Sequence, residues 1–270
     1  MRDRRIMHSS RQRWSITEVW RYRGLLRTMV VWGLKVKYQR SILGFLWTLL
    51  NPLLMVATLT AVFGYIVRIQ MHDYWAFLLS GYFAWNSITL SLFAGTYILA
   101  EHGSLRRSIS FPSEILVFSA AISRLVEFAI ETVLLIVVLA VAHHHGVPSG
   151  LLVTPLLFVP LLLLTAGLML PIATVSVFFR DTQHILPVVL TALFYLTPVF
   201  YRVDMVPHAL QPWYAVNPFA LLLVQFHTAL YDGRVPSLAM FSRTMAVATV
   251  AFVVGYALFN RYKNVAAEVV

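Results

Sequence analysis

The chain contains no cysteine and little charge. Only 12% of its 270 residues are Asp, Glu, Lys or Arg, whereas soluble domains carry about 25%. The missing cysteines exclude disulfides, thiol catalysis and cysteine-ligated metal sites. With 59% hydrophobic residues, so few charges cannot cover the surface of a soluble domain of this size. The composition therefore predicts a protein that is surrounded by lipid.

Sequence motifs for catalysis are missing as well. The chain has no G-x-x-x-x-G-K-[ST] phosphate loop, so it does not bind ATP in that way, and it has no H-E-x-x-H zinc motif. The consecutive residues His143, His144 and His145 do not converge on a metal, because neighbouring helical residues point about 100° apart. We therefore predict no catalytic residue, no metal site and no cofactor on this chain.

Positive charge is abundant, with a net charge of +10, and it is unevenly distributed. Eleven of the 21 Lys and Arg residues lie within residues 1–40, directly before the first long apolar run. Basic residues beside a membrane span bind anionic lipid headgroups and mark the cytoplasmic side. No basic stripe continues into a soluble domain, so the pattern predicts contact with membrane lipid and not with nucleic acid.

Six long apolar runs predict an all-α, polytopic membrane protein with six transmembrane helices. The first run has 23 residues, which reach about 34 Å as a helix and are enough to cross the hydrocarbon core. Pro155, Pro160 and Pro171 are expected to kink the fourth helix. The runs are 45–67, 74–99, 114–142, 151–179, 185–201 and 238–260.

A seventh stretch, residues 212–231, is also apolar enough to span, but the distribution of charge favours six spans. The cytoplasmic segments of a six-span chain hold 16 of the 21 Lys and Arg residues; they are 1–44, 100–113, 180–184 and 261–270. Both termini are then cytoplasmic. We interpret residues 203–236 as a re-entrant hairpin on the outer face, broken at Asn217-Pro218.

Residues 14–40 combine apolar and basic side chains in a pattern that is typical of an amphipathic helix in the cytoplasmic interface. Such a helix anchors the chain to the membrane surface or, in addition, docks a partner, and the sequence leaves both open. The apolar residues are Trp14, Ile16, Val19, Trp20, Leu25, Leu26, Met29 and Val30, and the basic ones are Arg21, Arg23, Arg27, Lys35 and Lys37.

Charged residues occur inside the third run. Arg124, Glu127 and Glu131 are three and seven positions apart, which places them on one face of a helix. Charges inside a membrane are costly unless they are paired or wet. Three roles remain open: an ion pair within the helix or with a neighbouring helix, a site that transmits movement from a cytoplasmic partner, or a proton relay.

Aromatic residues make up 14% of the chain, and many of them lie in the first, second and fifth runs. Two interpretations remain open: aromatic belts at the two membrane interfaces, or a slide of flat faces on which sugar rings pack. The residues that we select as channel-lining under the second interpretation are Trp47, Phe63, Tyr65, Phe194, Tyr195, Phe200 and Tyr201.

Several motifs, taken in order, resemble those of a known family. They are Trp20–Leu26 (WRYRGLL), Lys37–Trp47 (KYQRSILGFLW) with Asn51-Pro52-Leu53, Phe179–Thr182 (FRDT), Thr197–Tyr201 (TPVFY) and Asn217-Pro218. Their order and spacing over residues 17–265 are similar to those of polysaccharide ABC exporter permeases of the O-antigen and teichoic-acid type. These are the membrane subunits of type-2 ABC exporters.

The resemblance implies a multi-pass homodimer in the bacterial cytoplasmic (inner) membrane, paired with two copies of a separate ATPase subunit that binds ATP and Mg. It further implies that the chain itself is not an enzyme and exports a polyprenyl-pyrophosphate-linked glycan. The implied site residues are Glu101, Arg106 and Arg107 for coupling to the ATPase, Tyr38, Arg40 and Ser41 for the substrate entrance near the diphosphate, and Asn217 and Pro218 for the outer gate.

Three other functions fit an all-helical membrane protein. A membrane-embedded transferase needs a convergent His or Asp cluster, and a secondary transporter needs internal repeats with charges at mid-depth of several spans; the sequence shows neither. An ABC permease for a drug or small molecule shares the fold, but the Lys37–Trp47 region and the hairpin favour a polymer. The identity of the glycan stays open.

Overall fold

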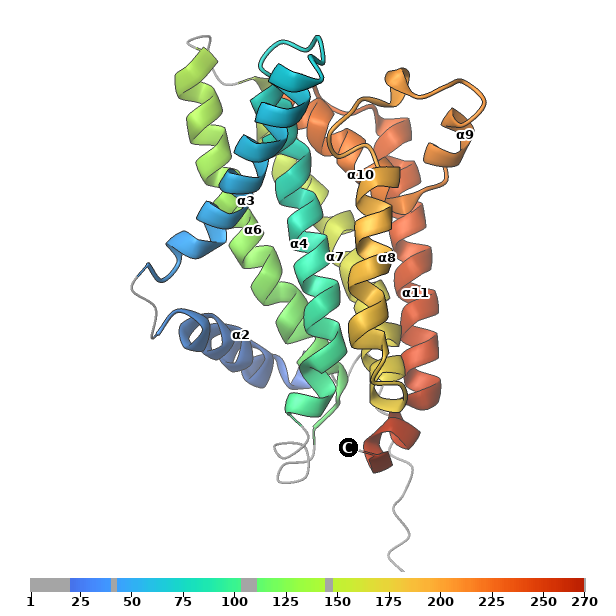
Figure 1. Cartoon of the computed structure of the whole chain (residues 1–270). Coiled ribbons are helices and arrows are strands. Elements are labelled where there is room, and N and C mark those ends of the chain that lie inside the picture. The colour runs from blue at the N-terminus through green and yellow to red at the C-terminus, as the bar shows by residue number, and fades with distance from the viewer. Residues whose placement is uncertain (1–19, 40–42, 103–110, 144–147, 270) are drawn as a thin grey trace, which may run out of the picture.

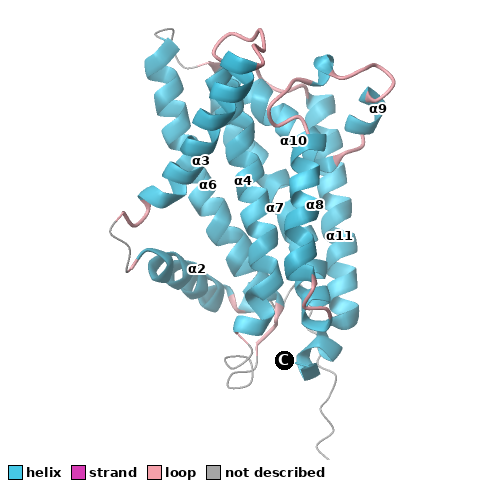
Figure 2. Ribbon diagram, viewed as in Figure 1, coloured by secondary structure: helices cyan, strands magenta, loops and turns pink. Residues whose placement is uncertain are grey.

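The computed structural model describes residues 20–39, 43–102, 111–143 and 148–269, and every regular element in these residues is a helix (Figures 1 and 2). The prediction of an all-α protein is therefore confirmed. The elements are α2 (Arg23–Tyr38), α3 (Leu46–Leu59), η1 (Thr60–Ile66), α4 (Tyr74–Glu101), α6 (Glu114–His143), α7 (Ser149–Phe178), α8 (Thr182–Leu196), η2 (Val203–Met205), α9 (Gln211–Tyr214), α10 (Pro218–Phe226), η3 (His227–Tyr231) and α11 (Leu238–Val269).

The long helices run along one another as a bundle, and α2 lies across one end of it (Figure 1). The C-terminal end of α11 is at the same end as α2, whereas α9 lies at the opposite end (Figure 1). The described residues form no sheet, so each helix buries its apolar face against other helices and satisfies its backbone groups internally, as a bilayer requires.

Four helical segments are long and apolar enough to cross a membrane: Leu46–Ile66, Tyr74–Glu101, Ser149–Phe178 and Leu238–Lys263. These make the chain a polytopic membrane protein. Helix α6 matches them in length, with 30 residues, but contains four charged groups. The three prolines of the fourth run all lie inside a continuous α7.

The helices formed by the fifth and sixth apolar runs end at other residues than the runs do. We expected one span over 185–201, but α8 ends at Leu196 and its 15 residues reach only about 22 Å. The reason is Pro198, because a proline pushes the residue before it out of the helical region; Thr197 is extended, with φ −113° and ψ 144°. In contrast, α11 continues to Val269, through most of the segment that we expected to be a tail.

Helix α4 forms the centre of the bundle. In its most apolar stretch, 72% of the residues are buried. The corresponding fraction is 17% for α3 with η1 and also for α11, so these helices turn most of their apolar side chains outward. Helix α4 packs against α6 and α7, and α7 packs against α11.

Two glycines bring α7 and α11 into backbone contact. A Cβ added at Gly255 would lie 1.8 Å from the carbonyl oxygen of Gly167, and one added at Gly167 would lie 2.6 Å from Phe252 Cα. Small residues at such a crossing allow two membrane helices to approach closely, which increases van der Waals contact.

We expect Gly255→Ala to lower the free energy of unfolding by roughly 1–3 kcal/mol, because the new methyl group forces the two helices apart. The matched control is Gly24→Ala in α2, where an added Cβ meets nothing within 4 Å. Thermal unfolding of the purified variants would measure the difference. Equal stability of the two variants would contradict the close approach of α7 and α11.

Candidate functional site

The side chain of Glu127 is the centre of a charge cluster where α2 meets α6. Lys37 Nζ donates to both carboxylate oxygens, at 2.8 and 2.9 Å, and Tyr38 Oη donates to Oε1 at 2.5 Å. Arg124 Nη1, one turn away on α6, donates to Oε2 at 2.7 Å. Glu127 is only 4% exposed, and these four hydrogen bonds compensate the loss of water around its charge. The cluster therefore contains both pairings left open by the sequence, one within α6 and one with a neighbouring helix.

Burial changes the acid–base behaviour of the α2 residues. It lowers the pKa of the Lys37 ammonium, and the hydrogen bond to Glu127 opposes that change. Burial and the same carboxylate raise the pKa of the Tyr38 phenol, so the phenol stays protonated and can donate its hydrogen bond. Glu131 lies one turn further along α6 and is also buried, but no described side chain donates a hydrogen bond to it.

The structure places only some of the predicted cytoplasmic residues. Tyr38 belongs to the Glu127 cluster, while Arg40 and Ser41 fall outside the described residues. Glu101 is exposed at the last turn of α4, and Arg106 and Arg107 of the same predicted coupling loop are also outside the described part of the chain. The role of these residues stays a prediction.

Phe200 lies at the centre of an aromatic network that contains five of the seven residues that we selected as channel-lining. Its ring centroid is 4.8 Å from that of Phe63, 5.5 Å from Phe194, 5.9 Å from Tyr195 and 5.0 Å from Tyr201. The network joins the π-helical end of the first span to the end of α8 and the loop that follows it.

The other two selected aromatics, Trp47 and Tyr65, lie near the two ends of the first span and are 46% and 78% exposed. Within the network, Phe194 and Phe200 are buried, whereas Tyr195 is 57% exposed. Tyr195 borders a cavity of about 230 Å³ between α3, α4 and α8, which is also lined by Tyr82, Trp85 and Phe93 of α4. Of the network, Tyr195 therefore offers the most accessible ring on which a sugar could pack.

The segment 203–236, for which we keep the name hairpin, is broken where the sequence indicates. Asn217 Oδ1 accepts hydrogen bonds from the backbone N–H groups of Phe219 (2.9 Å) and Ala220 (3.3 Å), and Pro218 is the first residue of α10. Both features are typical of a helix start. The chain therefore ends the short α9 and begins α10 anew at this point, at the end of the bundle opposite α2 (Figure 1).

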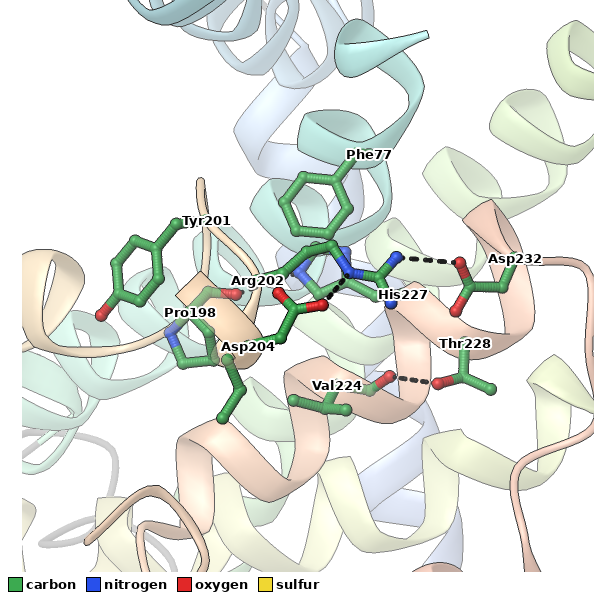
Figure 3. A pocket seen from close by; sticks show the side chains of 10 residues that line it. Phe77, Pro198, Tyr201, Arg202, Asp204, Val224, His227, Thr228 and Asp232 are labelled. Atoms are coloured by element: carbon green, nitrogen blue, oxygen red, sulfur yellow. Dashed lines mark hydrogen bonds and ion pairs between the residues drawn. The ribbon is translucent and has the colours of Figure 1, made fainter. Parts of the chain in front are cut away.

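A pocket of about 210 Å³ lies between the hairpin, α4 and the loop after α8 (Figure 3). Arg202 bridges two carboxylates across it, with Nε 3.3 Å from Asp204 Oδ2 and Nη1 3.4 Å from Asp232 Oδ1. One wall is the ring of Phe77, which stacks on His227 with centroids 3.9 Å apart. These contacts tie the hairpin to α4 and to the loop after α8.

His227 is a site residue that the sequence analysis missed. Its Nε2 lies 3.0 Å from the carbonyl oxygen of Pro198, and its Nδ1 lies 2.9 Å from Ser80 Oγ. A Cβ added at Gly81 would lie 2.4 Å from the His227 ring, so α4 accommodates the imidazole through a glycine. A single histidine in an apolar stretch gives no sign in the sequence that it connects three segments.

A second missed contact joins the two helices at the α2 end of the bundle. Lys263 Nζ of α11 donates to Glu114 Oε1 at the first residue of α6, at 2.5 Å, and both side chains are buried. Lys263 lies beyond the last apolar run, in a segment that the sequence predicts to be a tail, so the sequence gives no sign of this ion pair. Among the described residues, no group of three or more His, Asp or Glu side chains could hold a metal ion.

Comparisons with known proteins identify relatives along most of the chain. A family model described as "ABC-2 type transporter" matches residues 24–231. The chain is 28% identical over 255 residues to the O-antigen export system permease protein RfbA of Myxococcus xanthus, covering 94% of this chain and 98% of that protein. It is 26% identical to a protein of the same name from Klebsiella pneumoniae (87% and 91% covered). It is also 22% identical to the polysialic acid transport protein KpsM of Escherichia coli (84% and 89%).

We expect Glu127→Gln to weaken the attachment of α2 to α6, because Lys37 and Arg124 would lose their charged acceptor. Breaking a fully buried ion pair costs about 3–5 kcal/mol, and partial exposure of both cations reduces the expected loss to roughly 1–3 kcal/mol. Thermal unfolding would measure this loss, and trypsin cleavage within α2 should become faster. Asp181→Asn, which alters an exposed carboxylate, is the control. Unchanged melting and cleavage would show that the cluster does not hold α2.

Proposed function

Because the chain belongs to the ABC-2 type transporter family, we propose that it is the permease subunit of an ATP-driven exporter that moves a lipid-linked polysaccharide across the bacterial cytoplasmic membrane. The observation that carries the proposal is the similarity to O-antigen export permeases, which covers 94% of this chain and 98% of one such relative. The bundle of long apolar helices agrees with this role, since a polar polymer needs a protein path through about 30 Å of hydrocarbon.

Energy for this movement would come from a partner. The chain lacks a phosphate loop, so ATP and Mg would bind to two copies of a separate ATPase subunit, and two copies of this permease would form the channel. The segment 101–113 follows α4 directly and would contact the ATPase, with Glu101, Arg106 and Arg107 as polar contacts. Closure of the ATPases on ATP would then move α4 and α6, which flank this segment.

The substrate path would run from the α2 end of the bundle to the hairpin. Tyr38, Arg40 and Ser41 would lie near the diphosphate of the polyprenyl carrier, because cationic and hydroxyl groups bind phosphate. Aromatic faces such as that of Tyr195 would pack against successive sugars. The hairpin, which begins α10 at Asn217-Pro218, would close the outer end.

The proposed topology has six spans with both termini in the cytoplasm and the hairpin re-entrant from outside. Helix α10 and η3 together contain 14 residues and reach about 21 Å, close to the roughly 22 Å of α8, so the six-span count rests on the distribution of Lys and Arg and not on length. Most of this segment is buried among other helices, which is the shelter that a dipping backbone needs in a bilayer.

Because the native chain has no cysteine, single introduced cysteines can report the topology without background labelling. In intact spheroplasts, we expect a membrane-impermeant maleimide to label His208→Cys but not Asp181→Cys or Arg261→Cys, all at exposed positions. Disrupting the membrane should make all three reactive. Labelling of Arg261→Cys in intact spheroplasts would indicate seven spans and overturn the six-span arrangement.

We expect the chain, purified from its native membrane in mild detergent, to carry a stoichiometric ATPase subunit that contains a phosphate loop. Mass spectrometry would identify this partner and any polyprenyl-linked glycan that accompanies it. Deletion of the gene should remove the corresponding glycan from the cell surface and leave it inside. Purification without an ATPase in several detergents, together with a normal surface glycan after deletion, would refute the exporter role.

A further inference from the structure

A largely apolar cavity of about 460 Å³ lies where α2 covers the groove between α4 and α6. Its size falls within the range of about 300–1,000 Å³ that is usual for sites that bind small molecules. Apolar residues of all three helices line it, among them Leu25, Met29, Trp32, Ile98 and Ala120. An apolar space of this size beside a bilayer is a place where hydrocarbon chains are more stable than water.

Besides Lys37 and Glu127, the cavity is lined by Arg124, whose side chain ends in a guanidinium. It has five N–H donors, and within the described part of the chain Glu127 is its only hydrogen-bond partner, bound through Nη1 alone. The carboxylate of Glu127 already accepts hydrogen bonds from Lys37, Tyr38 and Arg124, so it has no room for more. Arg124 therefore brings unused donors to a cavity that is otherwise mostly apolar.

An amphiphile with one anionic group and a hydrocarbon chain fits both the donors of Arg124 and the apolar space beside them. Arginine binds phosphate oxygens with two parallel N–H···O bonds, and basic residues near the membrane surface attract anionic lipid headgroups. Arg27 and Lys35 are exposed and add positive charge to α2. Of the two carboxylates in the cluster, Glu127 lines the cavity and has its charge balanced by Lys37, whereas Glu131 is not among the lining residues.

We propose that this cavity is a binding site for an anionic phospholipid of the host membrane, whose phosphate binds Arg124 and whose acyl chain fills the space between α2, α4 and α6. The lipid would be a resident part of the permease, bound where α2 rests on the bundle. This role does not depend on the cargo, although the site adjoins the proposed substrate entrance, because the Glu127 carboxylate that binds Arg124 also accepts the hydrogen bond of Tyr38.

Lipid-dependent stability of the purified full-length chain tests the proposal. In detergent micelles, phosphatidylglycerol at about 100 times its dissociation constant should raise the melting temperature by roughly 5–10 °C, and phosphatidylcholine by clearly less. Mass spectrometry of the gently purified protein should find about one retained anionic phospholipid per chain.

Two variants separate the acyl-chain site from the headgroup site. Gly33 lines the cavity, and a Cβ added there meets only Ser123 Oγ, at 3.8 Å, so Gly33→Leu should place its side chain in the cavity. This variant should melt higher than the native chain without lipid and lose the response to phosphatidylglycerol, whereas Gly33→Ala should keep it. Arg124→Gln should respond equally to both lipids, whatever its baseline stability.

Three results would overturn the proposal. Equal stabilisation of the native chain by phosphatidylglycerol and phosphatidylcholine would show that no anion is recognised. A full lipid response in Gly33→Leu would place the lipid elsewhere. Retention of a polyprenyl diphosphate in place of phospholipid, lost in Gly33→Leu and kept in Gly33→Ala, would assign the cavity to the export carrier.

Discussion

Polar groups inside a bilayer have no water to bind, and this constraint determines how the helices of this protein are joined. Hydroxyl groups in the long helices donate to backbone carbonyls one turn earlier, as Thr132 does to Phe128 O and Thr174 to Leu170 O. Several of the remaining charged groups are paired across helices, as Lys37 is with Glu127 and Lys263 is with Glu114. Helices α7 and α11 are held together by close backbone contacts such as that between Gly167 and Gly255.

The middle of the bundle is therefore held by helix packing, and hydrogen bonds and ion pairs connect the helices near its two ends. Helix α2 is held to α6 through Glu127 as well as through apolar contacts, and α11 is held to α6 through Lys263 and Glu114. At the opposite end, the hairpin is held by hydrogen bonds of His227 and by the exposed, long contacts of Arg202. Exposed ion pairs contribute about 0–1 kcal/mol each, so the Arg202 contacts can open at little cost.

The sequence predicted the helical class and the positions of most long helices because hydrophobic runs are a local property. The family resemblance, built from ordered motifs, was confirmed by the match over residues 24–231. The sequence did not predict two helix ends. Pro198 ends α8 earlier than its apolar run, and α11 continues beyond its apolar run. Contacts between distant segments, such as Lys37 with Glu127, are not local, so their partners could not be read from spacing alone.

Helix α4 connects the two ends of the bundle, because its residues make contacts at both of them. At one end Tyr74 donates to Phe200 O at 2.6 Å, and Phe77 stacks on His227 of the hairpin. At the other end Ile98 and His102 line the cavity under α2, and Glu101 is the first residue of the segment proposed to contact the ATPase. A continuous, deeply buried helix of 28 residues cannot bend freely, since its neighbours α6 and α7 are packed against it. A displacement at Glu101 would therefore reach Phe77, which stacks on buried His227 next to Arg202, whose exposed ion pairs open at low cost.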